Sequence, residues 1–111
     1  MGIRGGDVQS YTGARDRLVH RVTVTTVSQS LPALITAAGG TLSANVEEIE
    51  IVNNGGATVY YQCGGVAATA TDAAIANGGN YTSVGNATNQ AAASLIAAGN
   101  VFVHLIERIV R

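Results

Sequence analysis

The sequence has 111 residues with a formal net charge of −1, and only 12% of its residues are charged. This length fits a single domain, and the near-balanced charge excludes a strong attraction to nucleic acid or to an anionic membrane. No apolar run approaches the roughly 20 residues of a membrane span, and the first residues lack the apolar centre of a signal peptide, so we expect a chain that neither crosses a membrane nor is secreted.

Residues 1–17 hold several glycines, charges of both signs and almost no apolar periodicity. Such a segment cannot offset the entropy of its own ordering, so we expect a flexible N-terminal arm before a single domain over residues 18–111. A frayed chain end is the simpler alternative. The arginines here alternate with Asp7 and Asp16 and suit paired contacts with another protein better than contacts with nucleic acid. The candidate interface residues are Arg4, Arg15, Arg17 and Arg21.

From Leu18 the chain is dense in valine and threonine with a period of two, which predicts a long strand over residues 18–27. One face of this strand would carry Leu18, His20, Val22 and Val24. Residues 31–35 follow, and Pro32 predicts an edge strand or a strand start because proline has no N–H to donate to a sheet. Residues 36–42 contain a Gly-Gly pair and predict a turn.

Residues 46–63 read VEEIEIVNNGGATVYYQC and predict a β-hairpin. In the first half two isoleucines alternate with two glutamates, which places an apolar pair on one face and carboxylates on the other. The second half alternates β-branched and aromatic side chains that fit a pleated surface. Between the halves lies Asn53-Asn54-Gly55-Gly56, which tolerates the positive φ angles of a tight turn.

Beyond Cys63, turns rich in glycine and asparagine separate short apolar pieces, which predict strands at residues 66–71, 81–84 and 94–96. The alanine run 91–93 could begin a helical turn, although it is far shorter than the roughly 12 residues of an independently stable helix. Residues 101–110 are apolar on both faces along most of their length, which predicts a central strand or an interface strand.

Many short strands joined by Gly/Asn turns, with no convincing helix, predict an all-β domain. We expect an antiparallel β-sandwich with a jelly-roll-like topology, or otherwise a small barrel. Tryptophan is absent and phenylalanine occurs once, so the core should consist of valine, isoleucine and leucine.

Two phrases carry a resemblance to a known class of proteins: EIEIVNNGGATVYYQCGG followed by VAATATDAAIANGG, and the later SLIAAGNVFVHLIERIV. Together they resemble small β-sandwich proteins of tailed bacteriophage virions, found as capsid decoration or cement proteins and in head or tail fibres. The resemblance covers about residues 44–110. Where that pattern often has a Pro-Gly turn, this chain has Asn77-Gly78-Gly79. The resemblance implies a structural role in the virion and supplies no active-site residues.

Catalytic chemistry has little support in the sequence, and we expect neither an enzyme nor a bound cofactor. His20 and His104 are the only histidines, and each lies within a strand pattern where packing is more common than metal binding. Cys63 fits a buried thiol better than a nucleophile. Glu47, Glu48 and Glu50 might suggest a cation site, but Glu48 and Glu50 share one strand face and more simply keep that face solvated. The glycine-rich segments lack the lysine and the helix of a phosphate-binding loop.

We therefore expect a capsid decoration protein on the virion surface, made in the host cytoplasm. It would bind the major capsid protein as a homo-oligomer, with a trimer favoured, and would bind neither nucleic acid nor a membrane. One alternative is a head-fibre or tail-fibre module that binds a host-surface glycan or protein through exposed aromatic side chains. Its candidate residues are Tyr60, Tyr61 and Tyr81. A neck or tail-completion protein is the other alternative.

Overall fold

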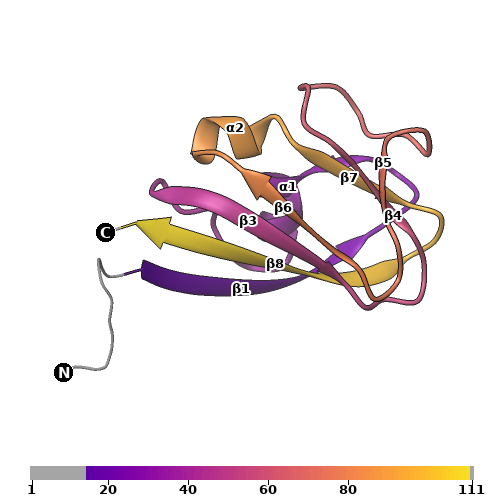
Figure 1. The fold of residues 1–111 in the computed structure, drawn as a ribbon, viewed down its shortest axis with the longest axis horizontal. Helices are drawn as coiled ribbons and strands as arrows, with labels where there is room; N and C mark the ends of the chain where they lie inside the picture. The colour runs from indigo at the N-terminus through magenta and orange to yellow at the C-terminus, as the bar shows by residue number, and fades with distance from the viewer. Residues whose placement is uncertain (1–14, 111) are drawn as a thin grey trace.

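The computed structural model describes residues 15–110, which form two antiparallel four-stranded sheets and two short helices (Figure 1). In chain order the elements are β1 (Arg15–Val24), β2 (Gln29–Ser30), α1 (Leu31–Ala37), β3 (Val46–Asn53), β4 (Val59–Gln62), β5 (Ala73–Ile75), β6 (Asn80–Val84), α2 (Ala87–Ala91), β7 (Ser94–Ala97) and β8 (Val101–Val110). The expectation of a mainly β domain is confirmed. Within residues 15–110 no helix has the length and apolar character needed to cross a membrane.

The strand order is β1-β8-β3-β6 in the first sheet and β2-β7-β4-β5 in the second. The first strand therefore pairs with the last, the second with the seventh, the third with the sixth and the fourth with the fifth. Strands β1–β4 and strands β5–β8 therefore pair as the two arms of one long hairpin. Each successive pair of strands lies in the other sheet. The two sheets share one core, as expected of a β-sandwich.

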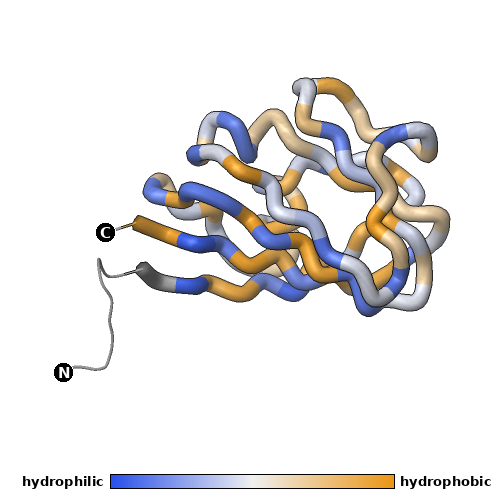
Figure 2. Tube along the Cα trace, viewed as in Figure 1, coloured by the Kyte–Doolittle hydropathy of each residue, from blue (hydrophilic) through white to orange (hydrophobic). Residues whose placement is uncertain are grey.

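The core consists mainly of aliphatic side chains from both sheets, as predicted. The first sheet contributes Val22, Ile49 and Leu105, and the second contributes Val59 and Leu95, all of them fully buried. The period-two alternation predicted for the first strand is confirmed, although that strand ends at Val24 and not at residue 27. Figure 2 shows apolar and polar residues following one another along β1 and β3. Strand β8 lies between β1 and β3, which confirms the prediction of a central strand.

The predicted hairpin at residues 46–63 is wrong, because β3 and β4 belong to different sheets. The connection between them is organised by the side chain of Asn53, which is completely buried. Its amide nitrogen donates to the carbonyl oxygens of Ala57 (2.7 Å) and Ile75 (2.8 Å), and its Oδ1 accepts from the N–H of Gly55 (3.1 Å). Gly55 approaches β8 so closely that a Cβ there would lie 2.6 Å from the carbonyl oxygen of Phe102. The Asn-Gly segment is a turn between sheets.

The predicted edge strand at residues 31–35 is also wrong, because this segment is the helix α1. Proline is favoured in the first turn of a helix, where its missing N–H would have no partner. Ser30 caps the helix by accepting from the N–H of Ala33 at 3.2 Å. Leu31, Leu34 and Ile35 face the core with helical spacing.

Three further expectations need correction. Residues 66–71 contain no strand, whereas β5 was missed at 73–75. The alanine run ends α2 instead of beginning a helical turn, because Asn86 caps that helix five residues before the run starts and Ala91 is its last residue. Strand β1 begins at Arg15, so residues 15–17 belong to the sheet and not to the expected arm. Residues 1–14 lie outside the described residues.

Candidate functional site

The first sheet has one face turned away from the core, which we call the outer face. Its side chains mix arginines and glutamates with apolar residues, several of which are well exposed. The outer face includes Arg17, Val19, Arg21, Glu48, Glu50, Val84, Phe102, Ile106, Arg108 and Val110. Among its apolar members, Val19 is 57% exposed, Phe102 51% and Val84 78%. These exposed apolar side chains make the outer face a candidate contact surface.

Of the four predicted interface arginines, two are placed together on the outer face. Arg17 and Arg21 are exposed on β1, and the Arg21 guanidinium lies 3.8 Å from the centroid of the Phe102 ring. This stacking holds the Arg21 side chain flat against β8 while leaving it exposed. Arg15 lies in β1 opposite Val110, and Arg4 lies outside the described residues.

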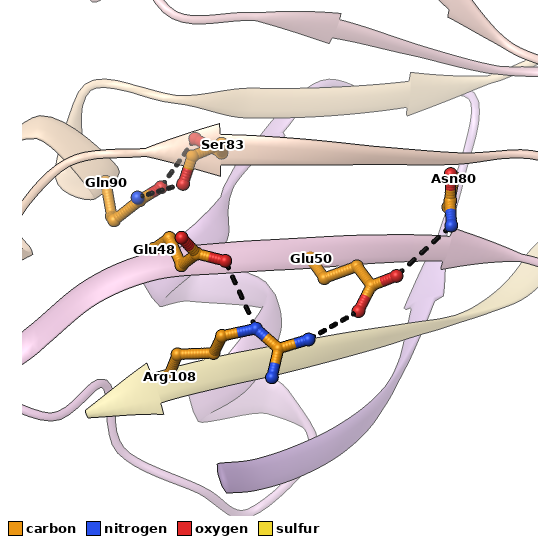
Figure 3. Close-up of polar contacts among 6 residues, drawn as sticks. All are labelled: Glu48, Glu50, Asn80, Ser83, Gln90 and Arg108. Carbon is orange, nitrogen blue, oxygen red and sulfur yellow. Dashed lines mark hydrogen bonds and ion pairs between the residues drawn. The ribbon is translucent and has the colours of Figure 1, made fainter. Parts of the chain in front are cut away.

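Arg108 on β8 forms the strongest charged cluster on the outer face (Figure 3). Its Nε donates to Glu48 and its Nη2 donates to Glu50, each at 3.1 Å. Asn80 on β6 donates to the other oxygen of Glu50 at 3.1 Å. The glutamates predicted to keep this face solvated therefore act as partners of one arginine and tie β8, β3 and β6 together. Among residues 15–110 no cluster of three metal-ligating side chains is found.

A histidine–carboxylate contact lies inside the domain, between His20 and Glu107. The Nε2 of His20 lies 2.5 Å from Glu107, whose side chain is fully buried. The other carboxylate oxygen accepts from the N–H of Ser43 at 2.9 Å. Gly40 covers the imidazole so closely that a Cβ there would lie 2.7 Å from its Nδ1. His20 is therefore packed inside the domain, and its contacts join β1, β8 and the loop after α1.

A neutral buried network links the other end of the first sheet to the second sheet. The hydroxyl of Tyr61 on β4 lies 2.6 Å from that of Ser83 on β6, and Ser83 donates to Oε1 of Gln90 on α2 at 2.7 Å. Since Ser83 has only one proton to donate, Tyr61 is the donor in the first contact. Gln90 donates to the carbonyl oxygens of Ser83 and Gly85, so both ends of its amide are bonded. Burial raises the pKa of the Tyr61 hydroxyl above its ordinary value.

No protein-family model, curated protein or solved structure matches this chain. The functional argument therefore depends on the geometry of its surfaces.

A groove of about 470 Å³ opens beside this neutral network. It is lined by Tyr61, Cys63, Tyr81, Thr82, Ser83, Val84, Thr88, Asn89 and Ala92. The rings of Tyr61 and Tyr81 form one wall, with their centroids 4.8 Å apart and their planes at 43°. Cys63 is exposed at this groove, so the prediction of a buried thiol is wrong. It follows the last residue of β4, where the strand leaves the sheet and the side chain is no longer covered.

The tyrosines predicted for ligand binding are therefore only partly brought together. Tyr61 and Tyr81 are neighbours, but Tyr61 is 7% exposed and its hydroxyl is used inside the protein. Tyr60 is half-buried and points to the opposite face of β4. The sequence did indicate one missed residue, because the alternation along the last strand places Glu107 among the apolar side chains. Nothing in the local sequence marks Gln90 as a buried partner of Ser83.

Proposed function

We propose that the sandwich is a jelly roll. In support, its eight strands form four nested antiparallel pairs, and the members of each pair lie side by side in the same sheet. Two four-stranded sheets connected in this way are typical of jelly rolls, an architecture common in viral capsid proteins and lectins.

We propose that this chain is a bacteriophage capsid decoration protein that binds the head surface and bridges major capsid protein subunits as a homotrimer. The outer face is the observation that carries the proposal. It places Val19 and Phe102 beside Arg17 and Arg21 on β1 and β8, with Val84 exposed on the opposite edge of the same sheet. Aromatic and arginine side chains are enriched in protein interfaces. Binding that requires the folded domain would stabilise the assembled head by mass action.

Location and copy number in the intact particle test this proposal. We expect cryo-electron microscopy to place the protein at repeated positions on the head, with the outer face toward the capsid. Val19→Asp should reduce occupancy on heads about tenfold or more, because it buries a charge in the interface. Val66→Asp is the matched control, since Val66 is 61% exposed on a loop between β4 and β5. Absence of the protein from heads would contradict the proposal.

Residues 1–14 test the proposed arm. Removing them leaves β1 intact, because that strand begins at Arg15. We expect the shortened chain to keep its unfolding midpoint but to bind heads more weakly. Equal head occupancy by the shortened and full chains would exclude a role for the arm.

A fibre module that binds a host-surface glycan or protein is the second candidate. It is favoured by the groove beside Tyr81, whose side chain is 42% exposed. Against a glycan site, Tyr61 is buried and Tyr60 faces elsewhere. Binding of the isolated chain to a glycan array would favour this candidate. If instead a few copies of the protein were found at the neck of the particle, a neck or tail-completion protein would be favoured.

A further inference from the structure

Strand β6 has main-chain groups that point away from its only neighbour in the sheet. Gly85 donates to the carbonyl oxygen of Glu47 and Asn53 donates to that of Gly79, both at 2.9 Å. In an antiparallel pair the bonded residues alternate, so Tyr81 and Ser83 bond to β3. The N–H and C=O groups of Asn80, Thr82 and Val84 then point outward. Within residues 15–110 no other main-chain group bonds to Thr82 or Val84.

The 470 Å³ groove runs along this same edge. Successive side chains of a strand point to opposite faces, yet residues 81–84 all line the groove. A groove touched by four consecutive strand residues must follow the edge of the strand and not one of its faces. Its far wall comes from α2 and the end of β4, through residues such as Asn89 and Cys63.

The groove also has a consistent electrostatic character, because its lining contains no arginine, lysine, histidine, aspartate or glutamate. A charged occupant would lose hydration there without gaining a counter-charge. A neutral strand loses little, since its main chain exchanges water for the free groups of β6. The lining therefore matches an uncharged segment in an extended conformation.

We propose that this groove binds an uncharged, extended peptide segment of a partner protein, which adds to the sheet as a strand beside β6. Main-chain hydrogen bonds to Thr82 and Val84 would supply affinity. Side chains on one face of the segment would contact Tyr81 and Asn89 and supply selectivity. The site adjoins the outer face and shares Val84 with it, but it uses the main chain of β6, so purified protein should bind such a peptide whether or not it also binds heads.

The test uses the full 111-residue chain and an array of synthetic hexapeptides. One set alternates Val, Ile, Thr or Tyr with Ser, Asn or Gln, and a matched set carries Asp or Lys at one central position. We expect saturable binding to members of the uncharged set and at least about tenfold weaker binding to their charged counterparts.

Two variants assign the binding to β6. Thr82→Pro removes an N–H that points away from β3, so the edge strand should fold while peptide affinity falls about tenfold or more. Thr23→Pro is the matched control on the opposite edge. Val110 donates to the carbonyl oxygen of Asn45, so the main-chain groups of every second residue of β8, Phe102 among them, point toward β3. Thr23 lies opposite Phe102, and its own main-chain groups therefore point away from β8. The Thr23→Pro variant should bind peptide normally.

Cys63 provides a second readout that needs no substitution. It is an exposed thiol on the groove wall, so a saturating peptide should slow its alkylation by iodoacetamide about fivefold or more. Failure of all uncharged peptides to bind, binding that leaves Cys63 alkylation unchanged, or equal affinity of Thr82→Pro and the parent chain would each overturn the proposal. Selective binding of oligosaccharides in place of peptides would overturn it as well.

Discussion

The two edges of the first sheet differ in the charge of their surface residues and in the chemistry of the buried contacts beneath them. At the β1 end, Arg17 and Arg21 flank the free edge, and the buried contact beneath it joins His20 to Glu107. At the β6 end the strand has no charged residue, and the buried contacts join Tyr61, Ser83 and Gln90. Arginines on an edge discourage the addition of another strand. The comparison indicates that the β1 edge is protected from strand pairing while the β6 edge remains open to it.

The largest expected effect comes from breaking the buried contacts of Glu107. Glu107→Ala leaves His20 and the N–H of Ser43 without their partner and should lower the free energy of unfolding by about 3–5 kcal/mol. Urea unfolding followed by far-ultraviolet circular dichroism measures this loss. Glu48→Ala is the control, since its ion pair with Arg108 is partly exposed and should contribute about 1 kcal/mol or less. Similar losses for both variants would contradict the distinction.

The neutral interior network should be the less costly one to break. Gln90→Leu keeps most of the side-chain volume but removes the acceptor of the Ser83 hydroxyl, which should cost about 1–3 kcal/mol. Tyr61→Phe should cost about 1 kcal/mol. Because the two residues share Ser83 as a partner, their combined loss should be smaller than the sum of the single losses. Additive losses would show that the network does not act as a unit.

The raised pKa of Tyr61 predicts a dependence on alkaline pH. Burial favours the neutral phenol in the folded state, so its contribution to stability is complete below the unfolded pKa of about 10 and is lost as the pH rises through the folded pKa. The stability difference between the parent chain and Tyr61→Phe should therefore narrow above about pH 10. Unfolding free energies measured at several pH values test this, and a constant difference would contradict it.

The smallest effect on stability is expected at the β1 edge. Replacing both exposed arginines, as Arg17→Thr and Arg21→Thr, should change the free energy of unfolding by no more than about 0.5 kcal/mol each. Self-association should nevertheless increase, because an edge strand of ten residues without its arginines at positions 17 and 21 can pair more readily with another copy. Sedimentation velocity over a range of concentrations measures it. If the double variant associates no more than the parent chain, the arginines do not protect this edge.

The alternation of residues 18–27 and the apolar run of residues 101–110 were sufficient to predict two long strands, which the structure has as Arg15–Val24 and Val101–Val110. Alternation identifies a half-buried strand because side chains project to opposite faces. The same alternation placed His20 and Glu107 on the core side of their strands. It could not show that they touch, since they are 87 positions apart in the sequence.

Local sequence signals led to wrong predictions where the same residues suit two different conformations. The Asn-Gly segment after Asn53 suits a hairpin, but here β3 pairs with β8 and β6, and β4 pairs with β7 and β5. Pro32 suits the start of a strand as well as the start of a helix, and the Ser30 cap with buried Leu34 and Ile35 favours the helix. In both places the choice depended on partners that lie far away in the sequence.

The sequence by itself determined that this is a β-rich chain with an aliphatic core and arginines concentrated toward its start, because composition and periodicity are local properties. Only the tertiary structure decided which strands became edges, which polar side chains met in the interior, and that a neutral groove follows β6. Strand pairing joins segments distant in sequence, and the exposed groups at an edge are those that this pairing leaves without a neighbour.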